Sequence, residues 1–373
     1  MPLIRNALVV GGGIAGMSAA LVLSRLGIEI DLVDQDPDWR VYGAGISITG
    51  PTLRAFQHLG ILEDFRQHGY CASDTRLFTP QGHPIGEIAT PPLAADLPAG
   101  GGIMRPILHE MLASRTRTAA ADIRLGVTVD SLTEDAEGVD VQFSDGREGR
   151  YDLVIGADGI YSRMRTLLFP EAPRPRFTGQ ACWRITVPRP PQVTGVEMYL
   201  GAPIKAGVNP CAADKMYLFA LESIAPNTRH TPADLPDLLR QRLSGFGGAI
   251  AFVRDQITDD SIINFRPLEA LLLPGPWHTG RTILIGDAAH ATTPHLASGA
   301  GMAMEDAVVL GAELAAADSL PAALSAFMAR RFDRAALVVN NSVRLGEIEQ
   351  SGVHSEEHPR LMNATMAALA QPL

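Results

Sequence analysis

Glycines and a carboxylate near the start of the 373-residue chain have the spacing of a nucleotide-binding turn. Gly11-x-Gly13-x-x-Gly16 follows an apolar run and opens a helical pattern. These glycines permit a tight turn and let a pyrophosphate approach the backbone, where it meets the positive end of the helix. Asp34 ends the next strand-like run, where a carboxylate can bind ribose hydroxyls. An acidic residue at this position favours NAD or the ADP half of FAD over NADP.

Two later motifs place a carboxylate in a turn after an apolar run. The turn Gly-Ala-Asp158-Gly leads into a helix, so Asp158 has two interpretations, a cofactor contact or a helix N-cap. In Gly286-Asp287 the carboxylate could accept a hydrogen bond from a ribitol hydroxyl. The small-residue segment 297–301 then opens another helix, whose N-terminus would stabilise negative charge on a flavin.

The elements that must position these motifs follow from hydrophobic periodicity. Strand, glycine turn, helix and strand over residues 3–34 predict a βαβ unit. The pattern also predicts helices over 51–59, 106–120, 235–243 and much of 299–348, a hairpin over 127–143, and strands over 151–156 and 282–286. Short strands dominate 70–102 and 177–266. This order favours an α/β nucleotide domain written in three pieces, with a β-sheet domain inserted between them.

Composition excludes several classes of protein. The formal net charge is -10, so we expect no nucleic-acid partner. Three separated cysteines cannot build a disulfide framework or a zinc site, and His290 and His295 lack a third ligand at helical spacing, so we expect no metal. The apolar start of the chain is interpreted as part of the fold and not as a signal peptide. No long uncharged apolar run spans a membrane, so we expect a cytoplasmic protein.

The three motifs in this order resemble those of the FAD-dependent aromatic hydroxylases, the group A flavoprotein monooxygenases with the para-hydroxybenzoate hydroxylase fold. The resemblance extends over about residues 3–348. It implies an α/β fold with a Rossmann-like FAD-binding domain, an inserted β-sheet substrate domain and C-terminal helices. We expect the FAD-binding domain to comprise residues 1–72, 101–172 and 268–350, the substrate domain 73–100 and 173–267, and a C-terminal helical segment 351–373.

The resemblance also implies which residues contact FAD. They are Gly11, Gly13, Ile14, Ala15, Gly16, Asp34, Gln35, Arg40, Gly45, Ile46, Arg105, Val129, Asp158, Gly286, Asp287, Pro294, Ser298, Gly299 and Ala300. Many family members carry Gly-Gln-Gly-x-Asn after the Gly-Asp motif. Here segment 297–301 lacks the Gln and Asn side chains, so flavin contacts would come from backbone N–H groups.

The strand containing Trp183-Arg184 is similar to one in the salicylate, 6-hydroxynicotinate and urate hydroxylase branch. Lys205 and Tyr217 align with an Arg and a Tyr of the urate enzymes, and they join His295 as candidate catalytic residues. Because Lys does not replace Arg in bidentate anion binding, urate itself is disfavoured. Candidate substrate contacts are Arg184, Cys182 and Pro294, and Lys205, Arg184 or Arg266 could hold an anionic substrate. Lys205 could instead be a solvated strand residue and Tyr217 a core residue.

The resemblance implies a monooxygenase that consumes NADH or NADPH and O₂. It would hydroxylate a small aromatic or heteroaromatic substrate through a flavin C4a-hydroperoxide. Two alternatives stay open: an enzyme of the same fold with another reaction, such as an antibiotic-modifying oxygenase or a reductase, and a plain NAD-dependent dehydrogenase. The enzyme would be a monomer or a homodimer, and residues 361–369 could form a dimer contact.

Overall fold

A six-stranded sheet brings the three motifs to one edge. The computed structural model describes residues 3–41, 43–352 and 356–373. The strand order is β18-β19-β12-β1-β2-β8, parallel except for the short edge strand β18. The bounds are β1 (Asn6–Val10), β2 (Glu29–Asp34), β8 (Asp122–Leu125), β12 (Leu153–Gly156), β18 (His278–Thr279) and β19 (Thr282–Leu284). Since ligands of such sheets bind beyond the carboxyl ends of the strands, the turns after β1, β12 and β19 share one crevice.

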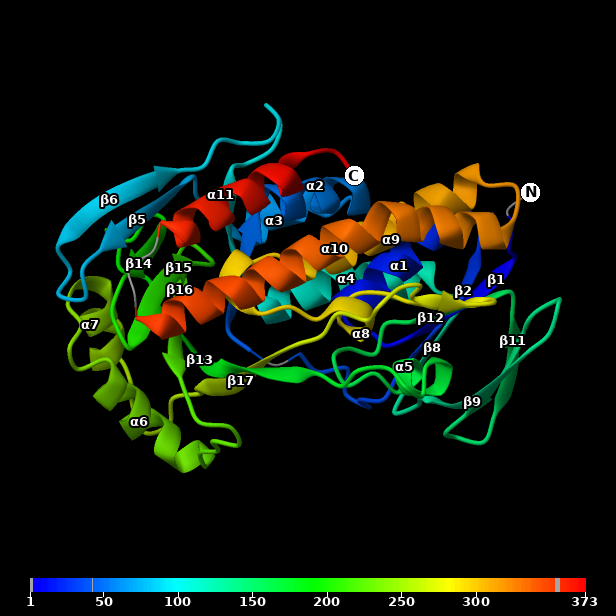
Figure 1. The fold of residues 1–373 in the computed structure, drawn as a ribbon, viewed down its shortest axis with the longest axis horizontal. Coiled ribbons are helices and arrows are strands. Elements are labelled where there is room, and N and C mark those ends of the chain that lie inside the picture. The colour runs from blue at the N-terminus through cyan, green and yellow to red at the C-terminus, as the bar shows by residue number, and fades with distance from the viewer. Residues whose placement is uncertain (1–2, 42, 353–355) are drawn as a thin grey trace.

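The central strands of this sheet are buried and apolar. The helices around the sheet and the motifs are α1 (Ile14–Ser24), α2 (Gly50–Leu59), α3 (Leu62–His68), α4 (Arg105–Ala119), α5 (Arg163–Leu168), α8 (Asp287–His290), α9 (Gly299–Ala316), α10 (Leu320–Ser351) and α11 (Glu357–Ala370). Of these, α1 packs directly against β1 and β2. In Figure 1, α10 crosses much of the length of the molecule, and α11 turns back beside α2. None of the helices in the described ranges combines the length and the apolar composition of a membrane span.

A seven-stranded sheet forms the second layer, in the order β17-β13-β16-β15-β14-β5-β6. The bounds are β5 (Asp74–Phe78), β6 (Pro84–Ala89), β13 (Arg176–Pro188), β14 (Val196–Tyr199), β15 (Ile204–Pro210), β16 (Lys215–Ser223) and β17 (Asn264–Ala270). Alternate residues of β13 and β16, such as Trp183 and Leu218, pack in a core with α6 (Leu235–Arg242) and α7 (Gly248–Asp255). The intervening residues face the other way, toward the motifs.

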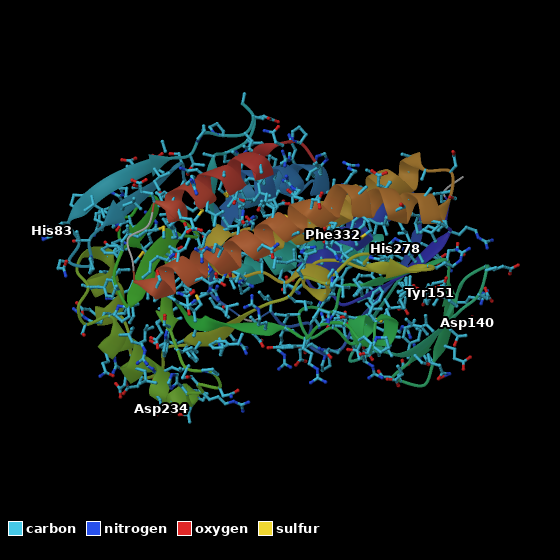
Figure 2. The ribbon with its side chains drawn as sticks, in the orientation of Figure 1. His83, Asp140, Tyr151, Asp234, His278 and Phe332 are labelled. Atoms are coloured by element: carbon cyan, nitrogen blue, oxygen red, sulfur yellow. The ribbon has the colours of Figure 1, made fainter. Side chains whose placement is uncertain are left out.

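Two smaller sheets complete the molecule. One is β3 (Gly45–Thr49), β7 (Gly100–Met104) and β4 (Tyr70–Cys71); the other is β9 (Val129–Glu134), β10 (Val139–Phe143) and β11 (Glu148–Tyr151). Single 3-10 turns occur at Pro232–Asp234 and Pro294–Leu296. Figure 2 shows Tyr151 and Asp140 at one end of the long axis and His83, in the β5–β6 turn, at the other.

The observed elements agree with the expected ones at most positions. The helical pattern over 299–348 is two helices, because the chain leaves α9 at Ala317 and Ser319 caps α10 by accepting a hydrogen bond from the Ala322 N–H. Helices α3 and α7 were not expected. Between β6 and β7 the segment 90–99 forms neither strand nor helix, although short strands were predicted for that stretch.

Candidate active site

The first glycine turn is shaped by contacts that leave no room for side chains. A Cβ on Gly11, whose φ is +111°, would lie 2.4 Å from the Ala157 carbonyl oxygen, and one on Gly16 would lie 1.9 Å from the Gly11 oxygen. Gly13 precedes α1, and no side chain caps the helix there. A Cβ on Gly13 would meet nothing within 4 Å. The first N–H groups of α1 are therefore available to an anion such as a pyrophosphate.

Asp34 lies beside this turn at the end of β2. Its two carboxylate oxygens accept hydrogen bonds from the Gly12 N–H at 2.6 Å and the Asp36 N–H at 2.7 Å. A cavity of about 110 Å³ adjoins the carboxylate and is lined by Trp39, Arg40 and residues of the glycine turn. The remaining lone pairs of Asp34 can accept hydrogen bonds from ribose hydroxyls there.

Asp287 faces the main cavity from the third motif. Within the described ranges its carboxylate has no hydrogen-bond partner. Protein atoms surround it closely although it is open to the cavity, and this burial raises the pKa of Asp287. An acceptor that is open to the cavity and has no described protein partner suits a polyol hydroxyl, such as one of ribitol.

A buried polar network holds the Gly286-Asp287 turn. The Asp306 carboxylate accepts hydrogen bonds from the Gly286 N–H at 2.8 Å and from Arg331 Nε at 2.8 Å, and it lies 2.6 Å from His290 Nε2. Burial alone would raise the pKa of Asp306, but His290 and Arg331 outweigh it and hold the value at about 2. Neighbouring Glu305 pairs with Arg331 and Arg334, which links the turn to α10. The contacts of Asp306 with Gly286 and Arg331 therefore fix the position of this turn, and we call them the Asp306–Arg331 brace.

The start of α9 offers a second uncapped helix N-terminus. Ser298 occupies the N-cap position, but its hydroxyl donates to the Leu296 oxygen at 2.7 Å and makes no cap. Gly299 and Ala300 line the cavity next to Pro294. Free N–H groups at this point can stabilise negative charge on a bound ring system.

One cavity of about 670 Å³ joins this cofactor edge to the seven-stranded sheet. From the cofactor side its wall includes Gly13, Ile14, Ala15, Gly45, Ile46, Arg105, Asp287, Pro294, Ser298, Gly299 and Ala300. From the sheet it includes Cys182, Arg184, Val196, Met198, Lys205, Asn209, Tyr217, Phe219, Leu221 and Leu268. The sheet residues follow the two-residue period of β13, β15 and β16. The wall is thus mostly apolar, with a few converging polar groups.

Tyr217 connects the two sides of the cavity. Its phenol oxygen lies 2.7 Å from Ser47 Oγ of β3, and Asn209 Nδ2 donates to the same Ser47 oxygen at 2.9 Å. Burial raises the pKa of Tyr217, while Ser47, Arg184, Asn209 and Arg105 oppose the rise. A Cβ on Gly45 would lie 2.0 Å from the Tyr217 ring, so the ring packs directly on the β3 backbone.

Two guanidinium groups in the cavity lack an anionic partner. Among the described residues, Arg184 and Arg105 make no side-chain hydrogen bond or ion pair. Burial, and then the charge of Arg184, lower the pKa of Arg105, whereas Tyr217 and Asp287 raise it. Uncompensated buried cations bind anionic groups strongly, so this part of the cavity is prepared for negative charge on a cofactor or a substrate.

Lys205 and His295 line the same wall of the cavity, and neighbouring side chains of the protein hold their polar atoms. The Lys205 ammonium pairs with Glu349 of α10, and both side chains are only 14% exposed. His295 lies 2.9 Å from Thr293 Oγ1 and 3.0 Å from Gln180 Oε1, and burial lowers its pKa. A neutral imidazole and a paired ammonium therefore contribute little net charge to this wall.

Other predicted residues lie outside the main cavity. The Asp158 carboxylate accepts the Met164 N–H at 2.9 Å and bonds Ser162, which is itself the N-cap of α5. Asp158 therefore supports the start of this helix, and only its neighbours Ala157 and Gly159 line the wall. Arg40 pairs with Asp36 and Asp38. Val129 is fully buried at the start of β9, and Gln35 is exposed after β2.

Sequence reasoning missed Ser47, Asn209 and Glu349. Nothing local marks these residues, because their partners lie in distant segments. It also missed Phe219 and Leu221, and the alternation of β16 around Tyr217 could have found both.

The glycine turn, Asp287 and the uncapped start of α9 border the main cavity, and Asp34 borders the smaller cavity beside it. Together they define an FAD-binding enzyme of the aromatic hydroxylase fold. The comparisons with known proteins agree. The family model described as FAD binding domain matches residues 5–342. The chain belongs to this family, and it is an FAD-dependent monooxygenase.

Individual relatives span nearly the whole chain. The aurachin C monooxygenase/isomerase of Stigmatella aurantiaca is 31% identical over 350 residues, which cover 92% of this chain and 89% of the relative. The FAD-dependent urate hydroxylase of Klebsiella pneumoniae is 30% identical and covers 88% of this chain and 86% of its own length. The solved structure of Klebsiella pneumoniae HpxO with FAD and uric acid superposes with a TM-score of 0.83 at 25% identity, covering 98% of this chain and 92% of that one.

Proposed function

We propose that the protein hydroxylates a small aromatic or heteroaromatic substrate, with O₂ and NADH or NADPH as co-substrates. One oxygen atom enters the ring, the other leaves as water, and the nicotinamide supplies two electrons. A relative named for urate, a small heteroaromatic compound, supports this substrate class. The observation that carries the proposal is the single cavity in which Pro294 and the α9 N-terminus face Arg184 and Tyr217.

FAD would lie along the cofactor edge. The N-terminus of α1 would hold its pyrophosphate, Asp34 its ribose and Asp287 its ribitol, with the ring system against Pro294. When bound, FAD accepts electrons from the nicotinamide and activates O₂. We assign this role to residues 1–72, 101–172 and 268–350, and substrate binding to 73–100 and 173–267, with 351–373 as the C-terminal helical segment.

The protein's own contribution is to orient the substrate and keep water away. Arg184 would hold an anionic or phenolic oxygen, and its charge would lower the pKa of a phenol. Tyr217 would bond the ring hydroxyl and move its proton toward Ser47. The apolar side chains of Met198, Phe219 and Leu221 would exclude water from the reacting atoms.

The test is the visible spectrum of the purified protein, followed by oxygen uptake with NADH or NADPH and a panel of hydroxy- and amino-aromatic acids. We expect flavin bands, faster nicotinamide oxidation with particular aromatics, and a product heavier by one oxygen atom. Substrate reduction without oxygen uptake would instead establish a reductase. A complete lack of stimulation by aromatics would overturn the proposed substrate class.

A further inference from the structure

Glu349 is the one carboxylate partner that the described residues give to Lys205, and it does not itself line the cavity. It reaches Lys205 from α10, at the back of the cavity wall. Two imidazoles also face it: His358 Nε2 of α11 lies 3.1 Å from its Oε1, and His295 Nε2 lies 3.6 Å from its Oε2. Despite burial, the charge of Lys205 and the two neighbouring imidazoles hold the pKa of Glu349 well below its usual range.

The two cations on the sheet side of the cavity therefore differ in whether a carboxylate neutralises them. On β15, Lys205 carries a positive charge that Glu349 cancels. On β13, Arg184 carries a positive charge that no described residue cancels. Because an ion pair presents far less field to a ligand than a lone cation, an anionic group has a partner at Arg184 and none at Lys205.

We propose that Glu349 is a specificity-determining residue that masks Lys205. It would make the cavity select an aromatic substrate with its anionic or electron-rich oxygen at Arg184 and no carboxylate at the Lys205 wall. This inference rests on the proposed function, because it concerns the substrate of the same site. Removing the Glu349 charge while keeping its shape should convert Lys205 into a second anion-binding cation.

The experiment measures dissociation constants of salicylate and its uncharged counterpart salicyl alcohol, from the change that each causes in the flavin absorbance of the FAD-loaded enzyme. The measurements are made at about pH 8, above the usual titration range of an imidazole. We expect Glu349→Gln to shift the ratio of the two constants about tenfold in favour of salicylate, as a newly freed charge contact would. In the Lys205→Met background, the same substitution should leave the ratio unchanged.

The matched control is Glu347→Gln, which removes the same charge on the exposed side of α10 and should not change the ratio. An unchanged ratio in a folded, FAD-loaded Glu349→Gln variant would overturn the proposal, and so would a shift that persists without Lys205. If that variant fails to fold, Arg184→Met and Lys205→Met in the otherwise native chain decide. If Glu349 masks Lys205, Arg184→Met should abolish the preference for salicylate, and Lys205→Met should leave that preference unchanged. These binding results do not depend on turnover, so they can fail while the hydroxylase assignment holds.

Discussion

The phenol oxygen of Tyr217 and the hydroxyl of Ser47 lie 2.7 Å apart, although 170 residues separate them in the chain. The contact joins the seven-stranded sheet to β3, the strand that borders the cofactor edge. The group expected to act on the substrate is thus oriented by the part of the protein expected to hold the flavin. Through this hydrogen bond, a shift of β3 at the cofactor edge should also change the orientation of Tyr217.

Substitutions at this pair should separate orientation from chemistry. Tyr217→Phe should lower kcat at least about tenfold, because it removes a group that moves a proton. Ser47→Ala should lower kcat less. Since the Ser47 hydrogen bond lowers the pKa of Tyr217, its loss should also move the limb of the pH–rate profile that reports this group to higher pH. The measurement is kcat/KM against pH at full FAD occupancy. A Tyr217→Phe variant that keeps that limb would exclude Tyr217 as the titrating group.

Gly45→Ala should disturb the same contact from the backbone. The added methyl would start 2.0 Å from the Tyr217 ring, so either β3 or the ring must move. We expect a loss of about 1–3 kcal/mol in the free energy of unfolding, together with lower FAD occupancy. Tyr217→Ala makes space, so the cost of Gly45→Ala should shrink in that background. Equal costs in both backgrounds would mean that the ring is not the obstacle.

Asp306 should control acid stability. The pKa of Asp306 is about 2 in the folded protein against an ordinary 3.8, so the group stabilises the fold fully above that ordinary value. The contribution fades as the pH falls from there toward 2. Asp306→Asn leaves Arg331 with one carboxylate partner fewer, and we expect it to cost about 3–5 kcal/mol near neutral pH.

Denaturant unfolding of both proteins between about pH 2 and pH 7 checks this expectation. The difference in the free energy of unfolding between wild type and Asp306→Asn should become smaller at the acid end of this range. A constant difference over the whole range would show that the Asp306 charge is not the source of the stability.

Asp34→Ala should weaken FAD binding in particular. The substitution removes the proposed ribose acceptor, the hydrogen bond to the Gly12 N–H of the glycine turn and the hydrogen bond to the Asp36 N–H. We expect the FAD dissociation constant to rise at least about tenfold, and Asp34→Asn, which keeps one acceptor oxygen, to lose less. Asp38→Asn nearby is exposed and should leave the constant unchanged. FAD titration of the apoprotein gives all three values.

The chain's local patterns predicted much of the fold and the cofactor edge. Gly11, Gly13 and Gly16 have a spacing that only a particular turn requires, and Asp34 and Asp287 follow apolar strands. Such signals lie within a few residues of one another. The polar contacts of the substrate side are different in kind. Asn209 meets Ser47, and Lys205 meets Glu349, across 162 and 144 residues, and no local pattern encodes such a pairing. The orientation of Asp158 was also open, because a turn carboxylate can cap a helix or face a ligand.

The Asp306–Arg331 brace has a consequence for how the protein is made. Ribosomes deliver the chain from its N-terminus, so the glycine turn after β1 emerges first. The β19 strand, the turn that carries Asp287 and the helix that supplies Arg331 emerge near the end of synthesis. A nascent chain therefore lacks the Asp287 side of the flavin-binding crevice for most of its time on the ribosome. We therefore expect FAD to bind after synthesis of the chain is complete. A chain truncated before α10 should be unable to retain FAD.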